Sequence, residues 1–361
     1  MTRTSRAVVA IAALALLPLL AACGDPNLPA PTPSTSTTAD GTPPASPDAT
    51  VDDTRARATD ATCAELAPAG TFDGLFSIPI VPVGPERTSA FVSTIIDETW
   101  LVEQAGGVAC DWQGAGSTVG SEGLFDYRGV RILLVPISDG AWSDFSATQT
   151  DPGEDILNCG DGICRRDVHV NGWWLSLWGF EFESEARQTV AVAAYTTIVA
   201  RVAALPSPRS VAHTSTLSSD CNLIVPRDRI AAAFGVSASS VLVEASHFPY
   251  LHDLVLGELG GADCNIRIDG VDVAEVQTVP GGADVRAEAV AAYNAIAGDQ
   301  EELLAVPGLA EPGSFRPQVE SSGFDIAPDG DWIKIIPWGG YGTRTLQETA
   351  VAIATIVVAA R

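Results

Sequence analysis

The chain has 361 residues, with 45 Asp and Glu against 20 Lys and Arg, and its net charge is −25 at pH 7. This acidic balance argues against nucleic acid and anionic lipid head groups as partners, because both are bound through basic patches. The length is sufficient for two ordinary domains.

The N-terminus has the layout of an export signal. Arg3 and Arg6 precede an uncharged apolar run over residues 7–22, which at about 16 residues is too short for a comfortable membrane span. The run ends in Leu20-Ala21-Ala22-Cys23, which resembles the lipobox of bacterial lipoproteins, where a signal peptidase cuts before a diacylated Cys. We therefore expect residues 1–22 to be a lipoprotein signal peptide. Acyl chains (palmitate) on Cys23 would anchor the protein at the extracytoplasmic face of the cell membrane.

Residues 23–58 are predicted to be a disordered tether. Pro, Ser, Thr, Asp and Gly dominate this segment, and its apolar residues show no periodicity. Such a segment cannot bury enough apolar surface to offset the entropy lost on ordering.

The rest of the chain contains four blocks that recur in the same order. Their offsets are 154 to 160 residues, so each unit is too long for a solenoid repeat. We expect two tandem homologous domains, residues 59–204 and 219–361, joined by a Pro/Ser/Thr-rich linker at 205–218. The blocks lie around Cys63 and Cys221, at 106–112 and 260–266, at 171–178 and 329–335, and at 189–201 and 349–361.

Six Cys follow Cys23, and an even number in an exported chain predicts three disulfides. The repeat assigns two of them, because Cys63 and Cys110 occupy the positions of Cys221 and Cys264. The remaining pair, Cys159 and Cys164, is interpreted as a local disulfide on a loop of the first domain.

Both domains are predicted to be α+β, each with an antiparallel sheet packed against helices. Apolar patterns predict strands at 130–136 and 271–279 and a helix at 283–296. In both halves a helix should follow the first Cys, most clearly at 226–234 before Gly235. Each half then ends in a Trp-rich strand and an apolar helix, 189–201 or 349–361, which is expected to be buried rather than to span a membrane.

Trp174, Trp178, Trp332 and Trp338 are candidates for an aromatic wall that binds a sugar or an acyl chain. The competing interpretation is that these rings pack the core, as large aromatic side chains usually do. The recurrence of the pattern at the most regular part of the repeat favours the core.

No cofactor, metal site or catalytic residue is predicted. His247 and His252 are five residues apart with Pro249 between them, so they cannot place two ligands on one helix face. The acidic loop 151–161, with Asp151, Glu154, Asp155 and Asp161, offers oxygen ligands for Ca²⁺ but lacks EF-hand spacing. Ser- and Cys-nucleophile motifs are also missing from the sequence, so we do not expect an enzyme.

The pattern Cys221-Asn222-Leu223-Ile224-Val225-Pro226, a helix ending in Phe234-Gly235, and a later Gly-Gly-x-x-Cys-x-Trp together resemble a known group. These are uncharacterised actinobacterial lipoproteins whose domains are similar to the extracellular sensor domain of mycobacterial receptor kinases. The resemblance implies a disulfide-containing α+β domain with a groove and no established enzymatic activity. This chain departs from the pattern at Leu66-Ala67-Pro68, where the spacing differs, and at Ile266, where Trp is expected.

The sequence thus predicts a lipid-anchored, non-catalytic binding or sensor protein of the cell envelope, with an unknown ligand or protein partner. The alternative is a secreted hydrolase that uses carboxylates or a bound metal. Matched polar clefts in both halves would favour recognition, whereas close carboxylates with raised pKa values in one half would favour the enzyme.

Overall fold

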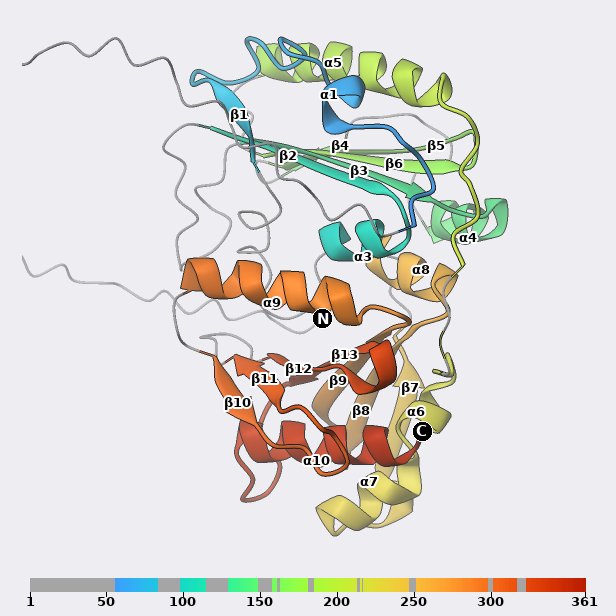
Figure 1. Cartoon of the computed structure of the whole chain (residues 1–361), viewed down its shortest axis with the longest axis vertical. Coiled ribbons are helices and arrows are strands. Elements are labelled where there is room, and N and C mark those ends of the chain that lie inside the picture. Colours follow the sequence, from blue (N-terminus) through green and yellow to red (C-terminus); the bar gives the residue numbers. More distant parts are fainter. Residues whose placement is uncertain are drawn as a thin grey trace, which may run out of the picture. The chain divides into compact units, whose positions relative to one another are not determined.

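Two antiparallel sheets organise the chain, one in each of the predicted halves (Figure 1). This computed structural model describes most of the chain after residue 55, so the signal segment, Cys23 and most of the tether lie outside it. The described residues are 56–83, 98–114, 129–148, 158–160, 163–180, 185–212, 215, 217–246, 251–297, 301–316 and 323–361.

The first sheet has the strand order β1-β2-β3-β6-β5-β4, and all its neighbours are antiparallel. Its strands are β1 (Ile80–Val83), β2 (Val108–Gly114), β3 (Gly129–Pro136), β4 (Asn158–Gly160), β5 (Ile163–Val170) and β6 (Trp173–Phe180). The helices of this half are α1 (Cys63–Leu66), α3 (Glu98–Gln104), α4 (Asp139–Thr148) and α5 (Glu185–Ala203).

The second sheet repeats that order as β7-β8-β9-β13-β12-β11 and adds β10 beside β11 at its edge. Its strands are β7 (Val241–Ala245), β8 (Ala262–Ile268), β9 (Val271–Val279), β10 (Glu302–Leu304), β11 (Gly313–Arg316), β12 (Gly323–Ile326) and β13 (Trp332–Pro337). The helices are α6 (Cys221–Ile224), α7 (Arg227–Phe234), α8 (Leu251–Glu258), α9 (Ala283–Ala297) and α10 (Leu346–Ala359). The predicted strands 130–136 and 271–279 and the helix 283–296 are confirmed.

Helix α7 is confirmed in the second half but has no counterpart among the described residues of the first. Pro226 precedes α7, and Gly235 ends it in the left-handed conformation at φ 69°. After α1, the equivalent segment of the first half forms turns, in which Gly70 and Gly74 have φ of 86° and 77°. Two left-handed residues four apart cannot belong to one α-helix, so the expectation of the same helix in both halves was wrong.

Each sheet carries an apolar core under one long helix. In the first half, α5 packs against β5 and β6, and the cluster beneath it includes Trp173, Leu175 and Tyr195. In the second half, α10 packs against β13 over a cluster that includes Ile335 and Ile353 (Figure 1). The two apolar helices are therefore core helices, as predicted. None of the helices in the described ranges has the length and apolar character needed to cross a bilayer.

A third core, which the sequence did not predict, is shared by the two halves. Helix α3 packs against α8 and α9, and α4 packs against α8. The Gln104 amide donates a hydrogen bond to the Pro280 carbonyl at 3.0 Å. Residues Ala49–Arg361 accordingly form one compact unit. The buried members of this shared core are Trp100, Leu101, Val102, Ala105, Leu133, Val135, Ile137, Phe145 and Trp174 from the first half and Leu251, Val255, Leu256, Leu259, Val279, Val285, Ala289 and Trp332 from the second.

Two Gly-Gly turns enter the sheets with the same geometry. The Gly107 N–H donates to the Val102 carbonyl and the Gly261 N–H to the Leu256 carbonyl, each at 2.8 Å. A Cβ added at Gly107 or Gly261 would lie 2.2 or 2.1 Å from a backbone oxygen of the neighbouring strand. Only glycine fits this close approach, which explains why both copies of the motif carry it.

The disulfides Cys63–Cys110 and Cys221–Cys264 are present, with Cα–Cα distances of 5.6 and 5.5 Å. They confirm the pairing that the repeat predicted. Cys164 is also disulfide-bonded, and Cys159 lies opposite it in the β4–β5 register. The side chain of Cys159 is outside the described part of the structure, so the third pairing stays a prediction.

The start of the predicted linker packs against the first half. The Trp173 indole N–H donates to the Pro206 carbonyl at 3.0 Å, and Arg209 forms an ion pair with Asp60 at 2.5 Å. The Arg209 backbone N–H also donates to the Ala58 carbonyl at 2.9 Å. This stretch is therefore held by the folded part rather than acting as a free spacer.

Candidate functional site

A row of buried polar side chains crosses the second sheet. Asp263 on β8 lies opposite Gln277 on β9, which lies opposite Lys334 on β13, then Asp325 on β12 and Ser314 on β11. All five side chains are buried. We call these five residues the polar row.

The row lies on the face opposite the α10 core. Because side chains alternate between the two faces of a strand, Cys264, Val276 and Ile335 point to that core while their polar neighbours point away from it. Helix α8 packs against β8 and α9 packs against β13, so helices of the shared layer cover this face. This polar face is thus enclosed by helices, whereas one face of an antiparallel sheet often meets water.

At one end of the row, Asp325 is held by hydrogen bonds and cations. The Trp332 indole N–H donates to its Oδ1 at 2.7 Å, the Arg316 guanidinium pairs with its Oδ2, and Lys334 Nζ lies 3.9 Å from Oδ2. Burial alone would raise the pKa of Asp325, but Arg316, Lys334 and Arg286 hold it below its usual value. This carboxylate therefore remains ionised inside the protein.

The first half contains the same Trp–carboxylate pair. Asp167 lies opposite Ser176 as Asp325 lies opposite Lys334, and the Trp174 N–H donates to Asp167 Oδ1 at 2.9 Å. Arg165 pairs with Asp167 at 2.5 Å. An arrangement that recurs in both halves and fixes a core Trp has a structural role.

The other end of the row forms a cluster with no such counterpart. His252 and Asp253 on α8 meet Asp263 on β8, and one potential ligand atom from each lies within 4.8 Å of the others. His252 Nδ1 is 3.3 Å from Asp253 Oδ1, and His252 Nε2 is 3.8 Å from Asp263 Oδ2. We call these three residues the His252 cluster.

Beside the cluster, Gln277 links Asp263 to a further carboxylate. Its amide donates to Asp263 Oδ2 at 3.3 Å and to Glu275 Oε1 at 2.5 Å. His252, Asp263 and Glu275 are 5%, 8% and 8% exposed. Three carboxylates and an imidazole are therefore gathered in one enclosed space.

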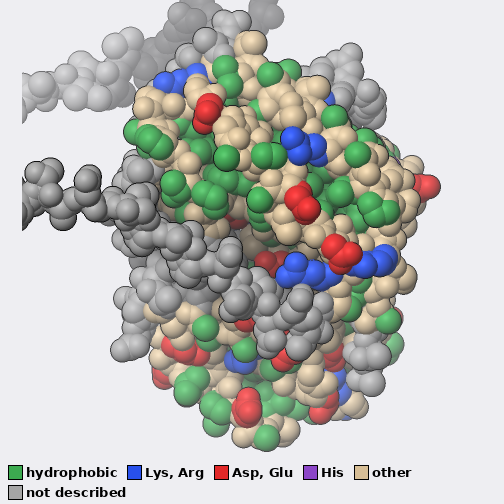
Figure 2. All heavy atoms as spheres, turned by 45° about the horizontal axis from the view of Figure 1, so that its top comes forward, with side chains coloured by type: hydrophobic (Ala, Val, Ile, Leu, Met, Phe, Trp, Pro, Cys, Tyr) green, Lys and Arg blue, Asp and Glu red, His purple; other side chains and the backbone are tan. Residues whose placement is uncertain are grey.

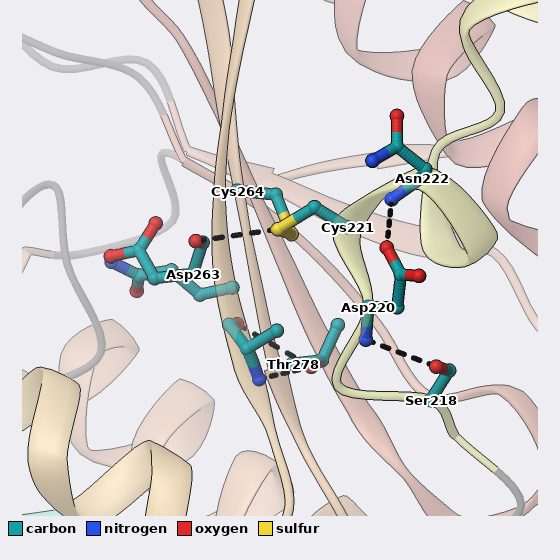
Figure 3. The surroundings of a disulfide bond; sticks show 9 residues. Ser218, Asp220, Cys221, Asn222, Asp263, Cys264 and Thr278 are labelled. Atoms are coloured by element: carbon teal, nitrogen blue, oxygen red, sulfur yellow. Dashed lines mark hydrogen bonds between the residues drawn. A yellow bond between two sulfur atoms is a disulfide. The ribbon is translucent and has the colours of Figure 1, made fainter. Parts of the chain in front are cut away.

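The disulfide of the second half positions this cluster. Cys264 follows Asp263 on β8 and ties the strand to α6 through Cys221, whose sulfur lies 3.6 Å from the Asp263 carbonyl oxygen (Figure 3). The Asp263 carboxylate points away from the disulfide (Figure 3). Asp220 caps α6 by accepting from the Asn222 N–H at 2.9 Å, which fixes the other side of the bridge.

Burial dominates the electrostatics of the cluster. It lowers the pKa of His252 to about 4, although a contact with Gln277 acts in the opposite sense, so the imidazole is neutral at pH 7. Burial and the nearby charges of Glu275 and Asp253 raise the pKa of Asp263. Burial also raises the pKa of Glu275, against the attraction of Lys334.

His252 Nε2 and Asp263 Oδ1 lack hydrogen bonds to the described residues. A buried polar atom without a partner costs roughly 1–3 kcal/mol. A neutral imidazole and crowded carboxylates can share such a space if a proton or a cation lies among them. The arrangement therefore suits a small cationic ligand.

The corresponding positions of the first half carry other residues. The matched Gly-Gly turns align Glu98 with His252 and Thr99 with Asp253, and the matched Cys align Ala109 with Asp263. Arg131 stands in the register position of Glu275 and pairs with Asp111 at 3.0 Å. The cluster thus belongs to the second half alone.

The four Trp proposed as an aromatic wall do not form one surface. Trp174 and Trp332 are 0% and 2% exposed and belong to the shared core. Trp178 is partly buried, with the Arg165 guanidinium 4.5 Å from its ring, whereas Trp338 is 48% exposed beyond the end of β13. Trp174 and Trp332 pack where the two halves meet, which favours the core interpretation for these rings.

Two sequence candidates lie outside the described residues: His247, and the acidic positions Asp151, Glu154, Asp155 and Asp161 of the loop 151–161. Sequence reasoning missed the His252 cluster because it sought two His on one helix. The available signal was His252-Asp253 near the start of a helix, with Asp263 eleven residues after His252 on the following strand.

A scan of protein-family models and searches of curated proteins and of solved structures find no match to this chain.

Proposed function

We propose that the protein is a lipoprotein of the cell envelope, anchored through Cys23, that binds a small cationic ligand without catalysis. The anchoring rests on the signal layout and the motif Leu20-Ala21-Ala22-Cys23. The two disulfides support it, since such bonds persist in oxidising compartments.

We further infer that the two halves arose by duplication of one disulfide-closed α+β unit. Their common strand order, paired Gly-Gly turns and paired Trp–Asp hydrogen bonds support this. The first copy supplies α3 and α4, which pack against the helices α8 and α9 that cover the polar face of the second sheet.

One observation carries the binding function. The His252 cluster gathers buried carboxylates around an imidazole in only one half, so it is not part of the repeated framework. The repeated framework does not require this site, and buried carboxylates are stabilised in their charged form when a cation pairs with them, which favours a bound cation. The acidic net charge of the chain acts in the same direction.

The described part of the face in Figure 2 gives no comparable feature. On the part of the face in Figure 2 that the structure describes, basic side chains lie close to acidic ones amid apolar and uncharged groups. This mixture does not single out a patch for a large partner of one charge.

The alternative, a hydrolase, has one observation in its favour: close carboxylates with raised pKa values in a single half. Burial argues against it, because the nearest candidates for an acid or base, His252, Asp263 and Glu275, are each less than a tenth exposed. A hydrolytic site must admit both water and its substrate.

Cell fractionation and mass spectrometry test the proposal. The mature protein should reside in the membrane fraction with a diacylglyceryl group on its N-terminal Cys23, and Cys23→Ser should release the full-length chain. Native mass spectrometry of the released protein should then reveal a bound cation. An unacylated N-terminus would refute the anchoring, and turnover of ester, peptide or glycoside substrates that Asp263→Asn abolishes would favour the hydrolase.

A further inference from the structure

We propose that the His252 cluster is a binding site for one divalent transition-metal ion of the Zn²⁺ class, with ligands from His252, Asp253 and Asp263. This inference rests on the proposed cation-binding function and names its ligand. It goes beyond the sequence prediction, which placed no metal site in the chain.

The donor set indicates this class of metal. An imidazole nitrogen with carboxylate oxygens is a typical Zn²⁺ environment, whereas Ca²⁺ takes six to eight oxygens and no nitrogen. Thiolate-selective metals are disfavoured because Cys264, the nearest sulfur on β8, is held in a disulfide. The ligand set leaves room for Glu275 or a water as a fourth donor.

The three ligand atoms would have to draw together, by a few tenths of an ångström between His252 and Asp263 and by up to roughly 1.6 Å for the widest pair. Ligand atoms around tetrahedral Zn²⁺, at about 2.0–2.2 Å from the metal, are roughly 3.2–3.6 Å apart. His252 Nε2 and Asp263 Oδ2 already lie 3.8 Å apart, and all three ligand atoms are within 4.8 Å. Small side-chain rotations would close the site without moving β8, which the Cys221–Cys264 disulfide holds.

An independent feature also points to a ligand. His252 is 5% exposed. Its Nε2 lies 3.8 Å from Asp263 Oδ2 and has no hydrogen-bond partner within the described structure. A neutral imidazole presents one nitrogen lone pair, which a metal ion would take up. The Gln277 amide, donating to both Asp263 and Glu275, orients the carboxylates beside it, as outer partners of metal ligands commonly do.

Lys334 does not replace the ion. Its ammonium lies 3.9 Å from Asp325, the next residue of the polar row, where it helps to balance a carboxylate that is fully buried. Its charge also attracts Glu275 beside the cluster, so Asp325 and Glu275 share this one cation.

The test is isothermal titration of ZnCl₂ into the tag-free mature chain, residues 23–361 with Cys23→Ser, after removal of metals by a chelator. We expect one equivalent of Zn²⁺ to bind with micromolar or tighter affinity. His252→Gln and Asp263→Asn should each weaken binding at least tenfold. The matched control is His169→Gln in the first half, where the imidazole lies 3.7 Å from a single exposed carboxylate, Asp139, and binding should be unchanged.

Failure of the wild-type protein to take up Zn²⁺, or wild-type affinity in both cluster variants, would overturn the assignment while leaving anchoring through Cys23 unaffected. If titration finds another bound cation and no Zn²⁺, the general proposal survives and the metal assignment does not. Circular dichroism of the metal-free variants establishes that they fold.

A second measurement needs no variant: Co²⁺ added to the wild-type protein should give the intense visible bands of a four-coordinate site. Bands no stronger than those of hydrated Co²⁺ would contradict the site.

Discussion

Replacing Asp325 with Asn removes one negative charge from the centre of the second sheet and leaves its cationic neighbours, among them Arg316 and Lys334, in place. Asp325 is 0% exposed, and the side chains of Arg316 and Lys334 are 6% and 4% exposed. The amide can still accept the Trp332 N–H. The substitution therefore isolates the loss of charge from loss of packing.

The magnitude follows from the geometry. Two unit charges about 4 Å apart attract by roughly 4 kcal/mol at an effective dielectric constant near 20. The desolvation cost of the carboxylate cancels part of this attraction, but the cations left behind stay buried. Breaking a buried pair from one side typically costs about 3–5 kcal/mol, and we expect Asp325→Asn to lower the free energy of unfolding by that amount.

Urea unfolding monitored by circular dichroism measures the effect, and Asp167→Asn is the matched control. Asp167 holds Trp174 in the same way, but its side chain and that of Arg165 are 15% and 23% exposed. We expect a loss of about 1–2 kcal/mol there, because water can solvate the unpaired group. A loss below 1 kcal/mol for Asp325→Asn, or equal losses for both variants, would refute this account of the polar row.

Three further predictions concern pH, the disulfides and the shared core. Because cations hold the pKa of Asp325 below its usual value, its stabilisation is fully present above about pH 4 and is lost as pH falls through the lowered pKa. The stability gap between wild type and Asp325→Asn should thus be constant from about pH 8 to 5 and shrink below 4; a gap that widens on acidification would be inconsistent. Replacing both Cys of either disulfide with Ala should lower the free energy of unfolding by about 4 kcal/mol. The loss should be similar in the two halves because the sequence separations are 47 and 43 residues. If denaturant unfolding gives losses that differ by more than about 2 kcal/mol, restriction of the unfolded chain is not the main source of the stabilisation. Leu256→Ala, in α8 of the second half, should cost about 2–5 kcal/mol. It should also speed amide hydrogen exchange in β3 of the first half, whereas the exposed Leu242→Ala should do neither; exchange confined to the second half would show that the core is not shared.

Much of the fold follows from local patterns in the sequence. The alternation or run of apolar residues at 130–136 and 271–279 specifies strands, and Pro226 and Gly235 bracket α7 as helix-boundary residues do. The repeat alone pairs Cys63 with Cys110 and Cys221 with Cys264, and both bonds are present. These features depend on neighbours in the chain or on comparison of one half with the other.

The candidate site depends on contacts that the sequence does not encode locally. Asp263, Glu275 and Gln277 alternate with apolar residues, the pattern of a sheet whose polar face meets water. In the structure, helices of the layer shared by the two halves cover that face. The burial that gives His252 and Asp263 their unusual environment is therefore a consequence of how α8 and α9 pack on the sheet.

The most direct test of the proposed site is X-ray diffraction with data collected on both sides of the zinc absorption edge, from crystals of the mature protein grown with one equivalent of Zn²⁺. The account predicts a single strong anomalous peak at about 2.0–2.2 Å from an imidazole nitrogen of His252 and from carboxylate oxygens of Asp253 and Asp263. Anomalous peaks found only elsewhere, with the His252 cluster free of metal, would contradict it.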